Sequence, residues 1–232
     1  MKKEKFVVLD VEGMSAVRPY NIGYVIADRD GKIYKHHSFA VPECLYENLQ
    51  NALITGQAID MTKHNIQEIL TDTGNPKRKR KYKLISANEF YHFFSKELKK
   101  HKVKRLFAYN VSFDKSALKR LFGEKRFNSL NLEYCDIISG ILTTKLLTKK
   151  YINFCLENGF ITEKGNIMTK AEIVYKYLTN CLDFIEEHTG LSDVLIEYDI
   201  LLTVFKAHKK VDFAPCQAWR ILKKFCKENE LI

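Results

Sequence analysis

The chain has 232 residues, of which 46% are hydrophobic, so it can bury the core of one domain with extensions. Its 38 Lys and Arg against 28 Asp and Glu give a formal net charge of +10, which suits a polyanionic partner where the charge clusters. Six cysteines without C-x-x-C spacing favour reduced thiols and a cytoplasmic protein over a disulfide scaffold. No apolar run reaches the roughly 20 residues of a membrane span. The apolar run near the N-terminus meets two acids too early for a signal peptide, so we expect no membrane partner.

Residues 6–13 (FVVLDVEG) form the first predicted element. Four apolar residues followed by Asp10, Val11 and Glu12 predict a buried strand, and the two-residue period of a strand places both acids on one face. Two carboxylates at the end of a buried strand repel each other and lose solvation. The pair of acids therefore indicates a site for cations.

Residues 20–27 and 32–39 are predicted strands joined at Asp30-Gly31, a strong hairpin signal. The region 42–70 is predicted to be mostly helical, with a break at Thr55-Gly56. Residues 71–83 (TDTGNPKRKRKYK) form a predicted exposed loop with six basic residues in 77–83. This basic insert is either a solvated surface, or a tract similar to a localisation signal, or it contacts the phosphate backbone of a nucleic acid.

An alternation of strands and helices follows the basic insert. Ser86 and Glu89 form a predicted capping box before a helix in which Phe90, Phe93 and Phe94 recur at core spacing. A strand at 105–109, a helix at 112–122, a strand at 132–137 and a helix at about 138–147 are then expected. This alternation predicts an α/β sheet with helices packed on its faces.

The last third of the chain is predicted to be mainly helical. A short hairpin at 160–168 precedes a second capping box, Thr169 and Glu172, which is expected to open a helix through 179. A long helix is predicted at 192–209. A final amphipathic helix should begin at Pro215, with an apolar stripe formed by Trp219, Leu222 and Phe225.

The chain is expected to divide into two parts. Residues 1–209 form the main domain and residues 210–232 a C-terminal helical extension. The extension docks on the domain or on a partner.

Two further acids stand at informative places. Asp114 lies in the first turn of the helix after the 105–109 strand, where it can point to the sheet edge that carries the first two acids; alternatively it only complements the helix dipole. In His188-Thr189-Gly190-Leu191-Ser192-Asp193, Ser192 as N-cap would place Asp193 in a first turn and His188 on the loop before it. Glu197 and Asp199 lie on the same helix but are not candidate site residues, because neither has a histidine at the matching distance.

Three motifs therefore occur in order: D-x-E at 10–12, N-x-x-x-D at 110–114 and H-x-x-x-x-D at 188–193. Together they resemble the DEDDh 3′-to-5′ exonucleases, a family that includes DNA polymerase III epsilon-type proofreading subunits, ribonuclease T and oligoribonuclease. The resemblance covers about residues 5–208. It implies a ribonuclease H-like α/β fold, with a mixed central β-sheet, an antiparallel hairpin and flanking helices.

The resemblance also implies roles for individual residues. Two divalent cations, Mg²⁺ or Mn²⁺, would be held by four carboxylates, those of Asp10, Glu12, Asp114 and Asp193. His188 would be the general base. Asn110 and Phe113 match positions that line the family's site, Asn110 as a hydrogen-bond donor and Phe113 in packing.

The chain departs from the family pattern directly after Glu12. A threonine, a glycine and an apolar residue usually follow, whereas Gly13-Met14-Ser15 stands here. Met14 is expected to supply the apolar wedge, and the Gly13 amide to meet the 3′ hydroxyl. Substrate preference is the property that this departure affects.

The resemblance implies a metal-dependent 3′-to-5′ exonuclease that acts on single-stranded DNA or RNA 3′ ends, with DNA favoured, and releases nucleoside 5′-monophosphates. The alternative is a catalytically silent ribonuclease H-like module that binds nucleic acid and recruits a polymerase or recombination partner. Four converging acids favour the enzyme, because nucleic-acid binding alone needs positive charge. The sequence leaves the oligomeric state open.

Overall fold

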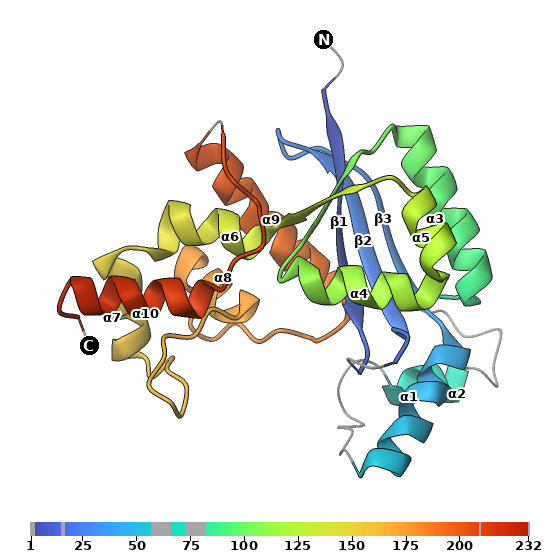
Figure 1. The fold of residues 1–232 in the computed structure, drawn as a ribbon, viewed down its shortest axis with the longest axis horizontal. Helices are drawn as coiled ribbons and strands as arrows, with labels where there is room; N and C mark the ends of the chain where they lie inside the picture. Colours follow the sequence, from blue (N-terminus) through green and yellow to red (C-terminus); the bar gives the residue numbers. More distant parts are fainter. Residues whose placement is uncertain (1–2, 15–16, 57–65, 73–81, 209, 232) are drawn as a thin grey trace.

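The computed structural model describes residues 3–14, 17–56, 66–72, 82–208 and 210–231. Within them lies a mixed six-stranded sheet of order β4-β3-β2-β1-β5-β6, shown in Figure 1. The strands are β1 (Lys5–Glu12), β2 (Asn21–Asp28), β3 (Ile33–Ala40), β4 (Lys83–Leu84), β5 (Arg105–Ala108) and β6 (Glu133–Asp136). β1, β2 and β3 pair antiparallel, whereas β5 and β6 continue the sheet in parallel and β4 pairs parallel with β3. The predicted α/β class and the Asp30-Gly31 hairpin are confirmed.

Helices cover both faces of the sheet (Figure 1). One face carries α3 (Ala87–His101), α4 (Val111–Phe122) and α5 (Glu124–Ser129). The other carries α6 (Ile137–Ile141), the π-helical turn η1 (Leu142–Leu146), α7 (Lys149–Glu157), α8 (Ala171–Thr179), α9 (Gly190–Ala207) and α10 (Ala218–Glu228). The helices α1 (Pro42–Thr55) and α2 (Ile66–Asp72) lie at the end of the sheet where β1 ends.

The alternation along β1 decides which face its acids occupy. Val7, Leu9 and Val11 belong to the core under α3 and α4, and Phe6 and Val8 to the core under α9. Because strand side chains alternate, Asp10 and Glu12 follow Phe6 and Val8 onto the α9 face.

Several local predictions are confirmed. Ser86 and Glu89 form the capping box of α3, with the Glu89 N–H donating to Ser86 Oγ (3.2 Å) and the Ser86 N–H to Glu89 Oε2 (2.9 Å). Phe90 and Phe94 are fully buried core residues. α1 ends at Gly56 in the left-handed conformation, at the predicted break. Residues 73–81, which hold most of the basic insert, lie outside the described residues.

Two predicted helix starts are wrong. α8 has Lys170 rather than Thr169 as its N-cap, without a side-chain cap. Glu172 instead pairs with Lys176 one turn along the helix (2.9 Å). α9 begins at Gly190 with Thr189 as N-cap, three residues before the expected cap, because Thr189 Oγ1 accepts the Ser192 N–H (3.4 Å).

Residues 151–157, which lie between the helix expected at about 138–147 and the hairpin, are helical and belong to α7. The predicted hairpin at 160–168 is confirmed by the antiparallel bridge between Ile161 and Ile167.

The last helix also differs from its prediction. α10 begins at Ala218 rather than Pro215; residues 211–217 form no helix, and within them the Phe213 carbonyl accepts the Asp136 N–H (2.8 Å). The buried stripe of α10 consists of Ala218, Leu222 and Cys226, so Trp219 is not part of it and is 46% exposed.

All six cysteines carry free thiols, as their spacing predicts. No helix among the described residues combines the length and the apolar character needed to cross a bilayer.

Candidate active site

The end of β1 is open on its β5 side. β5 pairs only with Val7 and Val8 of β1, so the last residues of β1 extend past the end of β5. The Val11 N–H, which lies in this unpaired part, donates to Asp114 Oδ1 of α4 (3.3 Å). A short β5 therefore brings the third predicted carboxylate to the strand that carries the first two.

The turn between β5 and α4 sets the position of Asp114. Asn110 occupies the left-handed conformation (φ 66°), which asparagine tolerates better than most residues, and precedes α4 as its N-cap. The Asn110 N–H donates to Oδ1 of the buried Asp136 at the end of β6 (3.1 Å). Asp114 lies in the first turn of α4 and is 2% exposed. Asp136 is not among the predicted site residues. The sequence feature that could have indicated it is its position at the end of the strand that pairs in parallel with β5.

The start of α9 approaches the sheet at Gly23, the β2 residue directly opposite Asp10. A Cβ at Gly23 would lie 1.9 Å from the Gly190 carbonyl oxygen, so only two glycines allow this contact. Thr189 accepts the Asp193 N–H through its carbonyl oxygen (3.0 Å), and Asp193 falls in the first turn of α9. The contact of the two glycines thus seats Asp193 beside β1.

Three of the four predicted metal ligands come together closely. Asp10, Glu12 and Asp193 each offer an oxygen, and these oxygens all lie within 4.8 Å of one another. Asp114 joins from the α4 side through Val11 and lies outside this group of three. Oδ2 of Asp10 is shielded from solvent and has no hydrogen-bond partner among the described residues.

The electrostatics of the cluster are unfavourable without a cation. Burial, followed by the charges of Glu197 and Glu12, raises the pKa of Asp10 well above its usual range. Burial is also the main cause that raises the pKa of Asp114 well above normal and the pKa of Asp193 to about 8. Carboxyls in this environment retain protons at neutral pH unless positive charge is brought among them.

Glu197 is, besides Asp136, a site residue that the sequence motifs do not include. It lies one turn after Asp193 on α9, is 4% exposed, and is the carboxylate with the largest effect on the pKa of Asp10. Its Oε2 accepts the Tyr109 N–H (3.1 Å), which ties α9 to the turn that starts α4. The available signal was the four-residue spacing from Asp193, which places both acids on one helix face.

His188 lies on the loop before α9, two residues ahead of Gly190. It has a left-handed backbone (φ 51°), and its Nδ1 is 3.7 Å from Glu186 Oε2. Its side chain is 36% exposed, so the imidazole is accessible from solvent on the loop that precedes α9.

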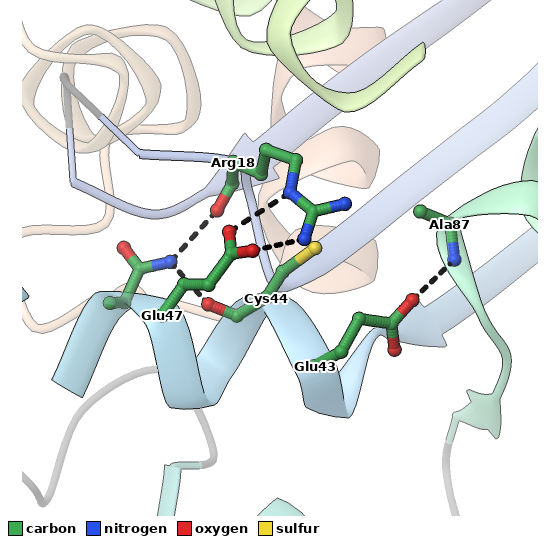
Figure 2. A network of polar contacts seen from close by, with 6 residues as sticks. Arg18, Glu43, Cys44, Glu47 and Ala87 are labelled. Carbon is green, nitrogen blue, oxygen red and sulfur yellow. Dashed lines mark hydrogen bonds and ion pairs between the residues drawn. The ribbon is translucent and has the colours of Figure 1, made fainter. Parts of the chain in front are cut away.

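The segment after Glu12 is held by α1, as Figure 2 shows for the contacts of Arg18. Arg18 forms a two-point ion pair with Glu47, in which Nε to Oε2 measures 2.9 Å. The buried Asn48 accepts the Met14 N–H (2.7 Å) and donates to the Arg18 carbonyl (2.8 Å). The structure thus places Gly13 and Met14 against α1.

Asn110 and Phe113, the two further site residues predicted within the N-x-x-x-D motif, differ in their surroundings. Phe113 is partly buried and packs against the core under α3 and α4. The Asn110 side chain makes no cap bond to α4, and the residue lines a cavity.

The donor set fits hard divalent cations. All close ligand atoms are carboxylate oxygens, which Mg²⁺ and Mn²⁺ prefer, and Asp10 has a buried oxygen, Oδ2, to which no group of the described residues donates. A cation would relieve the repulsion that raises the pKa values of these groups.

Comparisons with known proteins give a likeness in structure and none in sequence. No protein-family model matches the chain, and no curated protein matches its sequence. Among solved structures, it is similar to E. coli exonuclease I in complex with a dA16 oligonucleotide, with 14% identity, a TM-score of 0.51, and coverage of 89% of this chain and 42% of that chain. The complex of the same enzyme with a 5cy-dT13 oligonucleotide gives 14% identity, a TM-score of 0.51, and coverage of 88% and 41%.

The chain thus spans less than half the length of these neighbours. Its six-stranded mixed sheet, with an antiparallel β1–β2–β3 unit and helices on both faces, has the ribonuclease H-like fold of these exonucleases.

Proposed function

We propose that this protein is a metal-dependent 3′-to-5′ exonuclease that hydrolyses the phosphodiester bonds of single-stranded nucleic acid. The observation that carries the proposal is the meeting of Asp10, Glu12 and Asp193 within 4.8 Å, with a solvent-shielded Asp10 oxygen that has no donor in the part of the chain that the structure describes. Such a cluster is costly to bury unless it binds cations, which supports a functional role for it. DNA is the favoured substrate, a choice supported by the deoxyoligonucleotides bound to the structural neighbours.

The four carboxylates of Asp10, Glu12, Asp114 and Asp193 would hold two divalent cations, Mg²⁺ or Mn²⁺. When bound, such a pair stabilises the charge that develops on the scissile phosphate and favours ionisation of the attacking water. Asp136 and Glu197 position the site, because they fix the turn that begins α4 through the Asn110 and Tyr109 N–H groups.

His188 acts as the general base. It takes a proton from the attacking water while the water oxygen bonds to phosphorus and the 3′ oxygen of the preceding nucleotide leaves, so that a nucleoside 5′-monophosphate is released. Glu186 beside Nδ1 orients the ring and leaves Nε2 for the proton transfer. Gly13 and Met14, held by α1, contact the terminal nucleotide, and Asn110 hydrogen-bonds near it.

The test uses 5′-labelled DNA and RNA oligonucleotides of one sequence, with free or blocked 3′ ends. Each is incubated with Mg²⁺, with Mn²⁺ or with EDTA. We expect a ladder from the free 3′ end that EDTA abolishes, with DNA cut faster than RNA.

Asp10→Asn should remove activity while the fold persists, because the shape is kept and only the charge is lost. Asp183→Asn, at an exposed acid on the loop after α8, is the matched control and should remain active. Full activity in Asp10→Asn would refute the assignment. Salt-sensitive binding without cleavage under either metal would instead support the silent binding module.

A further inference from the structure

A cavity of about 660 Å³ lies between the start of α4, the 161–167 hairpin and the N-terminal end of α10. We call it the Trp219 cavity, lined among others by Tyr109, Asn110, Asn166, Lys170 and Trp219. Its volume falls in the range of about 300 to 1,000 Å³ in which proteins bind small organic ligands.

The inner wall of the Trp219 cavity is part of the candidate active site. The Tyr109 N–H donates to Glu197 (3.1 Å), and Asn110 stands one helical turn before Asp114. The turn before α4 therefore borders both the candidate active site and the cavity.

A second, smaller hollow extends the cavity outward. It measures about 230 Å³, shares Asn166 and Ile167 with the Trp219 cavity, and presents Lys164, Lys223 and Lys227. We call it the lysine hollow. Residues 218–228 of α10 contain four basic residues and one acidic residue, so the surface around the lysine hollow carries positive charge.

Trp219 is an exposed aromatic residue on a helix that other residues anchor to the core. The helix is anchored by Ala218, Leu222 and Cys226, which are 5%, 1% and 0% exposed, while Trp219 is 46% exposed at the cavity. The Arg220 guanidinium lies 5.1 Å from the centre of the Trp219 ring. An exposed indole with cations around it is the arrangement on which nucleic-acid bases stack.

We propose that the Trp219 cavity and the lysine hollow form a track for the single strand on the 5′ side of the terminal nucleotide. The proposal rests on the proposed exonuclease function. Trp219 stacks with a base, and the three lysines contact successive phosphates. Because stacking and charge are shared by all nucleotides, the track binds without sequence preference.

The first experiment compares substrates of two lengths. A dT12 oligonucleotide can reach the track, whereas the p-nitrophenyl ester of thymidine 5′-monophosphate occupies only the carboxylate site. Trp219→Ala should raise KM for dT12 about five-fold or more, the lower end of the effect of losing one base stack. It should leave kcat/KM for the ester unchanged.

Two variants control this experiment. Trp219→Phe keeps a stacking ring and should restore most of the affinity for dT12. Ile221→Ala removes a 38% exposed apolar side chain of the same helix that does not line the cavity, and should behave as wild type.

The second experiment measures binding without catalysis. Fluorescence anisotropy of labelled dT12 in EDTA gives Kd over a range of salt concentrations. Replacing Lys164, Lys223 and Lys227 together by Gln should reduce the slope of log K against log salt by about two, since each phosphate contact on a single strand contributes about 0.7. Lys224→Gln, at a lysine paired with Glu228 (3.6 Å) outside both hollows, is the control.

The outcomes separate the track from the exonuclease. If wild type cleaves neither substrate, the proposed function fails, and the anisotropy data decide the track alone. An unchanged KM for dT12 in Trp219→Ala, an equal loss on the ester, or an unchanged salt slope in the triple variant would overturn the track.

Discussion

The contact between Gly23 and Gly190 gives a sharp prediction about how the site is assembled. In Gly23→Ala, the new Cβ would lie 1.9 Å from the Gly190 oxygen and 2.5 Å from the Leu191 nitrogen. An ordinary contact needs at least 3.4 Å, so the start of α9 must retreat by about 1.5 Å. Both partners are backbone, so no side-chain rotation relieves the overlap.

Two losses follow from this displacement. Overpacking of this kind costs about 1–3 kcal/mol, and a backbone clash belongs at the upper end. For a chain of this size that lowers Tm by roughly 6–12 °C. The retreat also moves Asp193 away from Asp10, and a misplacement of about 1 Å can cost on the order of 100-fold in rate.

The assay is kcat on dT12 well below the lower Tm, together with Tm from thermal unfolding. Gly56→Ala is the matched control: its Cβ meets no atom of the described residues within 4 Å, but the left-handed backbone (φ 66°) costs about 1–2 kcal/mol. It should lose stability and keep kcat. Gly190→Ala, whose closest contact would be 2.5 Å, should show an intermediate loss if Gly23→Ala does not fold. Wild-type kcat and Tm in Gly23→Ala would refute the reasoning.

Three further predictions concern the charges of the site. The folded pKa of Asp193 is about 8 against an ordinary 3.8, so the metal-free folded state binds more protons between these values. Its free energy of unfolding should therefore fall as pH rises through this window, by up to about 1.4 kcal/mol per pH unit. The rise in Tm on adding Mn²⁺ should grow from pH 5.5 to 8, because the cation competes with protons, and a flat profile would contradict this. Glu197→Ala should lose about 1–3 kcal/mol in urea unfolding, since it leaves the Tyr109 N–H without its acceptor, whereas Glu197→Gln should keep the acceptor and stabilise the metal-free protein; equal effects would argue against this account. His188→Gln should lower kcat by about 100-fold or more while the Mn²⁺-induced rise in Tm persists, and wild-type kcat would exclude the general-base role.

Local patterns were enough to predict the elements that position the site. The apolar run and two-residue period of β1 place Asp10 and Glu12 on one face whatever packs there, because alternation is a property of the strand backbone. The Asp30-Gly31 hairpin and the Ser86–Glu89 capping box likewise depend on residues within a few positions of each other. The start of α4 near Asp114 belongs to the same class.

Only the tertiary structure decided which side chains meet. Glu197 and Asp136 are at the site because α9 and β6 pack against the turn before α4, at sequence separations of 88 and 26 residues that no local period encodes. Trp219 is predicted on the apolar stripe of α10, yet the docking of Ala218, Leu222 and Cys226 leaves it 46% exposed. Periodicity states that a helix has an apolar face, but the surface on which it packs determines which residues are buried.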